Sequence, residues 1–477
     1  MSTAPCQNPF PAGALPASRR AALRSRPVRW SAATLISALL LAGCGGGDGA
    51  GGPKAEAFSA DRSSYLVGER AILSARFSGG SASIDGGIGA VQNGGTVQTP
   101  PLDTTSTYSL TVRGGDGRVD ALSVTLAVSY RNRYQTLPVG ARLSGHASVS
   151  LADGSVLLIG GSRGTGTLSE RIDRFDPVSR SISALSIMYE GRTGTQALLL
   201  PDGKVLIGGG TTSGTDSRRL ELLDPATGSI VAAGQLSVPR VDAASTLLAD
   251  GKVMFCGGFT SGEGASAGIS RSCDIWDPAT RSVRRIANAL AAPRAGHRMT
   301  KLRDGRVLIS GGWSSVLPYV HAEIFQPASE SFTAIASPVT QMVAQHAAVL
   351  QPDGSVLLLG GERIAGHNIQ NVSAEVWRFD PATNGFHSRP PLAAPRTMAA
   401  VVPLRDGKLL LFGGQTELTR HSAGAERYDP ASGGQPIAGL DQDRAYLSAN
   451  RLADGRVLIA GGESIDGQFA TGLLIYE

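Results

Sequence analysis

The stretch Asp304-Gly305-Arg306-Val307-Leu308-Ile309-Ser310-Gly311-Gly312 decides the fold, because the chain repeats its pattern seven times. Each copy has Asp-Gly, one small or basic residue, an apolar triplet, one variable residue and Gly-Gly; the copies begin at Asp153, Asp202, Asp250, Asp304, Asp353, Asp406 and Asp454. Asp-Gly favours a two-residue hairpin turn, because both residues tolerate a positive φ. Paired glycines suit a strand end that a neighbouring backbone approaches closely. Each copy therefore predicts two antiparallel strands, a and b.

A second landmark follows in six of the seven copies. An aromatic residue or leucine stands before Asp-Pro or Gln-Pro, at Phe175, Leu223, Trp276, Phe325, Phe379 and Tyr428. Asp-Pro initiates turns, so it predicts two further strands, c and d, in each unit. Four strands repeated seven times form an all-β fold, the β-propeller. The units resemble the kelch repeat, in the bacterial form related to the central domain of galactose oxidase. That resemblance implies a seven-bladed kelch-type β-propeller over residues 131–477.

The last copy ends at Ile475-Tyr476-Glu477, before its fourth strand. Residues 131–138 precede Asp153 much as residues 229–239 precede Asp250, so they occupy the position of a strand d. We predict that this N-terminal segment closes the seventh blade, because the shared blade would hide both edges of the ring.

The first 43 residues have the pattern of an export signal. They contain five arginines and no acidic residue, and their apolar run from Ser31 to Ala42 is too short to span a bilayer. The run ends in Leu41-Ala42-Gly43-Cys44, which resembles the lipobox of bacterial lipoproteins. The resemblance implies a signal peptide over residues 1–43, acylation of Cys44 and, because Gly45 rather than Asp follows, export to the bacterial outer membrane. An ordinary signal peptide with a chance cysteine is the alternative.

Two segments separate this signal from the propeller. Residues 44–54 are rich in glycine and predict a flexible tether. In residues 55–130 apolar and polar side chains alternate, which predicts short strands joined by turns such as Gly114-Gly115-Asp116-Gly117. The stretch from Thr107 to Val112 resembles bacterial immunoglobulin-like domains. The resemblance implies a small immunoglobulin-like β-sandwich, which would act as a spacer or an adhesion module.

The formal charge of +5 does not indicate nucleic acid as a partner. The chain has 44 Lys and Arg against 39 Asp and Glu. Five of these arginines belong to the leader, so the rest of the chain balances 39 basic groups with 39 acidic groups. A balanced chain has no excess charge to attract phosphates. We therefore expect no nucleic-acid partner, and membrane attachment through the lipid on Cys44.

Cys256 and Cys273 are the cysteines of the propeller. Cys256 ends strand b and Cys273 begins strand c of the third unit, so they occupy facing ends of neighbouring antiparallel strands. Export would place them in an oxidising compartment. We predict a disulfide between them, with two unpaired buried thiols as the alternative.

The resemblance to galactose oxidase raises a copper radical site, which the residues do not support. That family uses a tyrosine cross-linked to cysteine and a second tyrosine followed directly by histidine. None of the nine tyrosines here precedes a histidine. His146, His297 and His346 share one strand position, seven residues before Asp-Gly. We expect them to form hydrogen bonds within their blades, and we predict no metal, no cofactor and no catalytic residue.

Charged residues also follow the repeat. Arginine stands ten residues before Asp-Gly at Arg192, Arg240, Arg294, Arg396 and Arg444, and Arg142 stands eleven residues before its Asp-Gly. An acid stands at the start of strand c at Asp173, Glu221, Asp274, Glu323, Glu375 and Glu426. Opposite charges at two repeated positions predict structural ion pairs, since a buried charge needs a partner. Glu375 and Arg444 have no predicted partner in their own copies.

We expect a ligand on one face of the propeller. In a four-strand meander the a–b and c–d turns share one face, and the b–c and d–a connections share the other. The first set is short and uniform, whereas length and unusual side chains vary in the second, as is typical of binding loops. The predicted binding residues on that face are Trp313, Tyr319, Arg363, His367, Asn368, Arg420 and His421.

These observations favour a membrane-anchored propeller with a non-catalytic binding or scaffold role, which recognises a protein or a glycan in the cell envelope. The alternative is a carbohydrate-active enzyme similar to sialic-acid mutarotases or galactose oxidase, which also use kelch propellers. Neither family's catalytic residues can be matched to positions in this sequence.

Overall fold

The fold comes from a computed structural model, which describes residues 52–138, 143–164, 167–213, 216–260, 268–314, 322–336, 342–365, 368–470 and 472–477. The predicted signal peptide, Cys44 and most of the tether lie outside the described residues. Every regular element of the described residues is a β-strand, which confirms the all-β prediction. No helix of the described residues is long and apolar enough to cross a membrane.

Residues 54–129 form two sheets around one apolar core. The first sheet has the order β1-β3-β6, with β1 Lys54–Ala60, β3 Ile72–Ser78 and β6 Thr96–Gln98. The second has the order β2-β8-β7-β4-β5, with β2 Ser64–Leu66, β8 Val119–Ser129, β7 Ser106–Arg113, β4 Ser81–Ile84 and β5 Gly89–Val91. The predicted alternation along β7 places Leu110 and Val112 in the core, both fully buried. The immunoglobulin-like character of this part stays a prediction.

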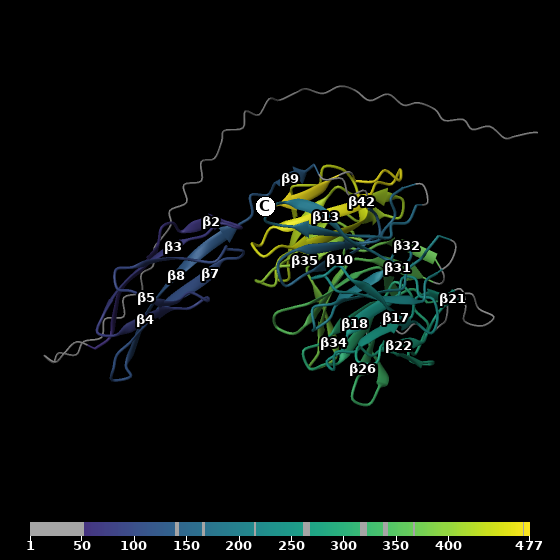
Figure 1. The fold of residues 1–477 in the computed structure, drawn as a ribbon, viewed down its shortest axis with the longest axis horizontal. Coiled ribbons are helices and arrows are strands. Elements are labelled where there is room, and N and C mark those ends of the chain that lie inside the picture. The colour runs from purple at the N-terminus through teal and green to yellow at the C-terminus, as the bar shows by residue number, and fades with distance from the viewer. Residues whose placement is uncertain are drawn as a thin grey trace, which may run out of the picture. The chain divides into compact units, whose positions relative to one another are not determined.

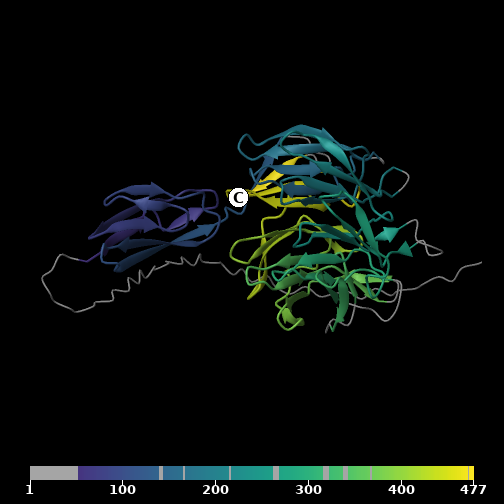
Figure 2. The same cartoon turned by 60° about the horizontal axis from the view of Figure 1, so that its bottom comes forward.

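The later strands form seven four-stranded antiparallel sheets, numbered 1 to 7 in chain order (Figures 1 and 2). Sheet 1 contains β10 Ala147–Ser150, β11 Val156–Ile159, β12 Arg171–Asp176 and β13 Ser181–Ile187. Sheet 2 contains β14 Gln196–Leu199, β15 Val205–Gly208, β16 Arg219–Leu223 and β17 Ile230–Gln235. Sheet 3 contains β18 Ala244–Leu247, β19 Val253–Cys256, β22 Cys273–Trp276 and β23 Val283–Ile286.

The remaining sheets follow the same meander. Sheet 4 contains β24 Arg298–Lys301, β25 Val307–Ser310, β26 Ala322–Gln326 and β27 Ser331–Ile335. Sheet 5 contains β29 Ala347–Leu350, β30 Val356–Leu359, β33 Val376–Asp380 and β34 Gly385–Arg389. Sheet 6 contains β35 Ala400–Pro403, β36 Leu409–Phe412, β39 Ala425–Asp429 and β40 Gly433–Ile437. Sheet 7 contains β41 Ala445–Arg451, β42 Val457–Glu463, β43 Leu473–Tyr476 and β9 Tyr134–Leu137.

The first strands of successive sheets contact one another from β35 through β41, β10, β14, β18 and β24 to β29, so β10 of sheet 1 contacts both β14 of sheet 2 and β41 of sheet 7. Figures 1 and 2 both show the C-terminal sheet, in yellow, beside the blue strands of sheet 1. The ring is closed by β9, which pairs with β43 from Tyr134 opposite Tyr476 to Leu137 opposite Leu473. The N-terminal segment is therefore the outermost strand of the last sheet.

The repeated motifs have the conformations that their residues favour. Gly305 of an Asp-Gly turn has φ +88°, and the Asp304 carboxylate accepts a hydrogen bond of 3.1 Å from the Arg306 N–H. Gly311, the first of its glycine pair, has φ +63°, and a Cβ there would lie 2.1 Å from the Val343 carbonyl oxygen. The glycine pairs therefore let each sheet end against the backbone of its neighbour.

The aromatic residues before the Asp-Pro turns form the packing between sheets. Trp276 of sheet 3 is fully buried among Leu206 and Leu220 of sheet 2. Tyr428 of sheet 6 is likewise buried against Leu357 of sheet 5. Each such side chain removes a large apolar area from water, and this burial holds neighbouring sheets together.

The b–c connections of three sheets carry additional strands on the predicted binding face. Sheet 3 has a hairpin of β20 Phe259–Thr260 and β21 Gly268–Ile269, and sheet 6 has one of β37 Gln415–Glu417 and β38 Arg420–His421. Sheet 5 has the small sheet β28-β31-β32, with β28 Met342–Ala344, β31 Glu362–Ala365 and β32 Asn368–Val372. These strands build up one face of the ring and leave the opposite turns short.

Cys256 and Cys273 form a disulfide between β19 and β22, where they stand opposite each other in register. Both side chains are fully buried. The bond closes the chain segment that contains the hairpin of β20 and β21.

Candidate functional site

Most charges of the repeat are committed to structural ion pairs. The predicted pairs are confirmed in sheets 2, 3, 4 and 6 as Arg192 with Glu221, Arg240 with Asp274, Arg294 with Glu323 and Arg396 with Glu426. All eight side chains are at most 5% exposed. Each arginine also donates to the carbonyl of the first paired glycine, as Arg294 does to Gly311 at 2.7 Å. These groups therefore tie loops to strands and are not free to bind a ligand.

Arg444 and Glu375, which had no predicted partner in their own copies, each form an ion pair with a nearby residue. Arg444 pairs with Asp441, three residues earlier, and Glu375 pairs with Arg363 of β31. Arg363, a predicted binding residue, is thereby held on the outer side of its strand, because its neighbours Glu362 and Ile364 are buried on the other side.

The three repeated histidines lie between sheets. His146 contacts the Ser448 hydroxyl of sheet 7 at 2.7 Å, and His346 contacts the Ser310 hydroxyl of sheet 4 at 2.9 Å. The expectation of hydrogen bonds within their own blades is wrong, because the rings of His146 and His346 reach the preceding sheet and neither ring nitrogen of the buried His297 has a hydrogen-bond partner among the described residues. Burial lowers the pKa of His146 to about 4 and of His346 to about 3, so both are neutral at physiological pH. In the described part of the chain no three His, Cys, Asp or Glu side chains are arranged to hold a metal ion.

A ring of seven residues with positive φ surrounds the axis at the binding face. Each stands eight residues before Asp-Gly, with φ between 50° and 64°: Gly145, Gly194, Asp242, Gly296, Gln345, Met398 and Tyr446. Backbone hydrogen bonds join neighbours, as from Gly296 N–H to the Asp242 carbonyl at 2.8 Å and from Gln345 N–H to the Gly296 carbonyl at 2.8 Å. We call these seven residues the axial ring.

Four members of the axial ring are not glycine, although the conformation favours glycine. A left-handed backbone costs a residue with a Cβ about 1–2 kcal/mol. Asp242, Gln345, Met398 and Tyr446 accept this cost in sheets 3, 5, 6 and 7, whereas sheets 1, 2 and 4 have glycine. Such strain concentrates at binding and catalytic sites. The axial ring is therefore the first structural indication of a functional site.

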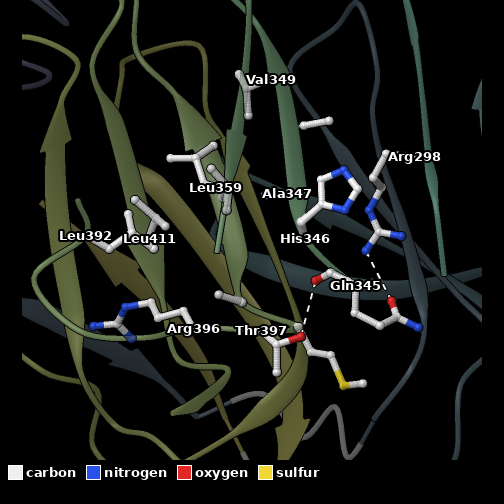
Figure 3. Close-up of a pocket in the computed structure, with 14 residues that line it drawn as sticks. Arg298, Gln345, His346, Ala347, Val349, Leu359, Leu392, Arg396, Thr397 and Leu411 are labelled. Carbon is white, nitrogen blue, oxygen red and sulfur yellow. Dashed lines mark hydrogen bonds between the residues drawn. The ribbon is translucent and has the colours of Figure 1, made fainter. Parts of the chain in front are cut away.

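Arg298 connects two of these side chains. Its guanidinium donates to the Gln345 side-chain oxygen at 3.3 Å (Figure 3). The Gln345 side chain also hydrogen-bonds Asp242. Gln345 passes directly over Gly296, where a Cβ would lie 3.0 Å from its Nε2. The Asp242 side chain is exposed, yet desolvation by the surrounding protein raises its pKa, and the charge of Arg298 and the hydrogen bond with Gln345 partly oppose that rise. Glycine at 296 thus lets the amide bridge sheet 5 to sheet 3.

Glu362 of β31 is the unusual carboxylate of this region. It is 6% exposed, and no described residue gives it a hydrogen bond or an ion pair. Burial, followed by the charge of Asp242, raises its pKa to about 7. Tyr446 lies near the same groups: burial and then the carboxylates of Glu463, Glu362 and Asp242 raise the pKa of its phenol. We call Asp242, Arg298, Gln345, Glu362 and Tyr446 the axial cluster.

A pocket of about 250 Å³ adjoins this cluster. Arg298 and Gln345 of the cluster and Met398 of the axial ring line it, together with His346 and Thr397 (Figure 3). The Thr397 hydroxyl is fixed by donation to the Gln345 carbonyl at 3.3 Å. Aliphatic side chains of sheets 5 and 6, such as Val349 and Leu411, form the rest of the wall. The pocket is thus polar at the cluster and apolar between the sheets.

An aromatic pair stands beside β31. The rings of Trp313 and Phe259 are 5.7 Å apart, and Phe259 is 37% exposed. Trp313 packs on Ala344 and Ile364, and Ala344 is the backbone partner of Glu362 in register. Trp313 therefore packs against the small sheet β28-β31-β32 that carries Glu362, whereas Phe259 belongs to β20 and contacts Trp313.

Of the seven predicted binding residues, Trp313 and His421 lie near the axial cluster. His421 is buried, with Nδ1 2.8 Å from the Glu463 carbonyl oxygen and Nε2 3.0 Å from the Gln415 side chain, and its ring packs against Tyr446. It therefore positions Tyr446. The Arg420 side chain is 72% exposed, with only Glu417 nearby at 3.8 Å. Tyr319, His367 and the Asn368 side chain lie outside the described residues.

The sequence did not bring the axial cluster together, because its members come from sheets 3, 4, 5 and 7. One signal was present. Gly145, Gly194 and Gly296 share one repeat position, and glycine there points to a special backbone conformation. The four copies that replace this glycine identify Asp242, Gln345, Met398 and Tyr446.

Comparison with known proteins supports the fold. No protein-family model matches the chain, and no curated protein matches it. A solved structure of a fungal alcohol oxidase of the AA5 family, in complex with copper, matches with a TM-score of 0.58 and 16% identity, over 72% of this chain and 75% of that one. The structure of YjhT matches with a TM-score of 0.46 and 17% identity, over 60% of this chain and 94% of that one. At this identity the alcohol oxidase shows the fold alone: the chain is an all-β protein with a β-propeller.

Proposed function

We propose that the chain is an exported, lipid-anchored propeller that binds a saccharide at the axial cluster. Residues 1–43 would direct export, Cys44 would carry the lipid in the outer membrane, and residues 55–130 would form an immunoglobulin-like spacer. The observation that carries the proposal is the convergence of polar side chains from four sheets at the axial ring, beside an aromatic pair and a pocket.

The chemistry of the cluster suits a sugar. A sugar ring offers hydroxyl groups that donate and accept hydrogen bonds, and C–H faces that pack on aromatic rings. Asp242 and Glu362 supply acceptors, Gln345 and Arg298 supply donors, and the pair of Trp313 and Phe259 supplies an aromatic surface. A few placed polar groups in a mostly apolar cavity are the usual composition of a ligand site.

The pocket also limits the size of the ligand. Its volume of about 250 Å³ lies just below the roughly 300–1,000 Å³ of sites for drug-sized molecules. One or two sugar rings fit that size, with any further units of a glycan extending over the binding face. A protein ligand would instead bury the flat rim of loops and leave the pocket empty.

Binding is tested with the full-length protein on a glycan array, followed by calorimetry on the glycan retained. Trp313→Ala and Asp242→Asn should each weaken binding roughly tenfold, which corresponds to about 1.4 kcal/mol. Glu330→Gln is the control, because Glu330 is an exposed carboxylate that pairs with Arg284 in a c–d turn, on the face opposite the cluster. An array without any retained glycan, or equal affinity for all variants, would point to a protein partner and refute the proposal.

A second candidate is a carbohydrate-active enzyme, and Glu362 is the observation that favours it. A carboxyl group with a pKa of about 7 can both donate and accept a proton near neutral pH. Such a group could open and close a sugar ring at its anomeric centre. Copper oxidase chemistry fits less well, because the disulfide occupies both propeller cysteines and leaves neither for a bond to tyrosine.

The two candidates differ in one measurement. The measurement is the rate at which the anomers of the bound sugar interconvert, monitored by NMR. If the protein is an enzyme, it should accelerate this interconversion, and Glu362→Gln should abolish the acceleration while the sugar still binds. For a binding protein, the interconversion rate should equal that of the free sugar.

A further inference from the structure

We propose that the saccharide held by the axial cluster carries a free ammonium group, which pairs with Glu362. This inference rests on the proposed function and adds the chemical class of the ligand. It starts from a carboxylate that the described protein leaves without a partner.

The charges of the cluster are unbalanced. Asp242 has Arg298 and Gln345 beside it. Glu362 is 6% exposed and has no hydrogen bond or ion pair among the described residues. The charge that acts on it is a second carboxylate, Asp242, and the charges of both, together with that of Glu463, act on the phenol of Tyr446. A buried carboxylate needs a partner, because unpaired burial is strongly unfavourable. A ligand cation would supply it.

The other arginines near Glu362 among the described residues already pair with other carboxylates. On the same strand, Arg363 is held by Glu375. Behind the cluster, Arg294 pairs with Glu323, and at the pocket wall Arg396 pairs with Glu426. Among these groups Asp242 has the guanidinium of Arg298 beside it, whereas the charge that acts on Glu362 is a second carboxylate. An anionic sugar, such as a uronic acid, would add to this excess of negative charge.

The aromatic groups strengthen the case for an ammonium ion. Trp313 packs on the backbone partner of Glu362, Phe259 stands against Trp313, and the phenol of Tyr446 lies close enough to Glu362 for the carboxylate charge to raise its pKa. The negative face of an aromatic ring attracts cations, and recognition of ammonium groups by several rings is the recurring use of this effect. A carboxylate beside aromatic rings therefore matches an amino sugar better than a neutral one.

A neutral sugar is the competing ligand, because Glu362 could take up a proton and donate a hydrogen bond. The two cases respond oppositely to pH. An ammonium group requires the carboxylate, so its affinity should fall as pH drops below about 7, by up to about tenfold per pH unit. A neutral sugar that accepts a hydrogen bond from protonated Glu362 should bind more tightly as pH drops.

The test is calorimetry of the full-length protein with glucosamine, N-acetylglucosamine, glucose and glucuronic acid, at pH values on either side of the pKa of about 7. We expect glucosamine to bind at least roughly tenfold more tightly than the acetylated or hydroxyl analogue, about 1.4 kcal/mol, and glucuronic acid to bind least. Glu362→Gln should remove this preference and keep weak binding of glucose. Glu330→Gln, a matched exchange at an exposed carboxylate of the c–d turn in sheet 4, should keep the preference.

The outcomes separate the inference from the proposed function. Equal affinities, or a preference for a neutral or acidic sugar, overturn the ammonium ligand and leave saccharide binding intact. A preference that survives in a folded Glu362→Gln variant overturns the role of Glu362. Failure of every sugar to bind, by a protein with an unchanged melting curve, overturns both proposals.

Discussion

Glu362 stands where a stable sheet would place an apolar side chain. Its neighbour Ile364 on the same side of β31 is 1% exposed, in contact with Trp313. A carboxylate at 6% exposure lowers stability whenever it is ionised. Residues that reduce stability without a compensating contact are expected at functional sites. The stability of the protein should therefore report on this residue directly.

We predict that Glu362→Gln stabilises the protein at alkaline pH. The pKa in the folded state is about 7, raised from 4.5. Below pH 4.5 the carboxyl group is protonated in the folded and the unfolded protein, so it costs no stability. Between pH 4.5 and about 7 the free energy of unfolding of the natural protein falls progressively, and above pH 7 it stays at the lower value. The shift corresponds to a difference on the order of 3 kcal/mol. Urea denaturation should show equal midpoints near pH 4 and a higher midpoint for the variant near pH 8.

The exposed Glu375 provides the control for this measurement, because Glu375→Gln replaces a carboxylate that is 47% exposed. Its midpoint should change little at either pH. A Glu362→Gln variant that is less stable than the natural protein at pH 8 would show that the carboxylate has a stabilising partner.

Individual residues were predictable where the repeat fixes their position. The buried arginines and acids could be paired from the sequence, because both recur at a constant distance from Asp-Gly. The axial cluster could not, because Asp242, Arg298 and Glu362 belong to different sheets and meet only through the curvature of the ring. Repetition reveals what every sheet shares, whereas a binding site depends on where the sheets differ.

At the scale of elements the same contrast holds. The a–b hairpins follow from Asp-Gly and the paired glycines, and β24 and β25 pair from Arg298 opposite Ser310 to Lys301 opposite Val307. The strands inside the b–c connections, such as β31 and β32, were expected only as variable loops. These short segments have no repeat and little alternation of apolar and polar residues. Only the pairing of β31 with β28 and of β32 with β31 defines them as strands.

We predict that the disulfide stabilises sheet 3 and its b–c hairpin. Cys256 and Cys273 are 17 positions apart, and closing a loop of that size restricts the unfolded chain by roughly 3 kcal/mol. A Cys256→Ala/Cys273→Ala variant should lose about that much stability in guanidinium unfolding. The natural protein measured with a reductant should lose a similar amount, and unchanged midpoints in both experiments would contradict the prediction.

At the scale of the whole molecule, the ring depends on one strand from the far end of the propeller sequence. β9 completes sheet 7 by pairing with β43, so the edges of both chain segments are covered by hydrogen bonds. Side chains reinforce this closure. The Tyr134 hydroxyl donates to the Ala438 carbonyl at 2.7 Å, and its ring packs against Tyr476 at 5.2 Å and Phe412 at 6.4 Å.

Tyr134 therefore tests whether the ring unfolds as one unit. Tyr134→Phe removes one hydrogen bond and should cost about 1 kcal/mol. Tyr134→Ala also removes the packing between sheets 6 and 7, and for this half-buried ring we expect a loss of roughly 2–3 kcal/mol. Because closure joins the ends, unfolding of the Ala variant should remain a single transition at a lower temperature. Val178→Ala, at a side chain that is 91% exposed, should melt like the natural protein. A Tyr134→Ala variant with an unchanged melting temperature, or one that loses only sheet 7 in a separate step, would show that the ring does not depend on β9.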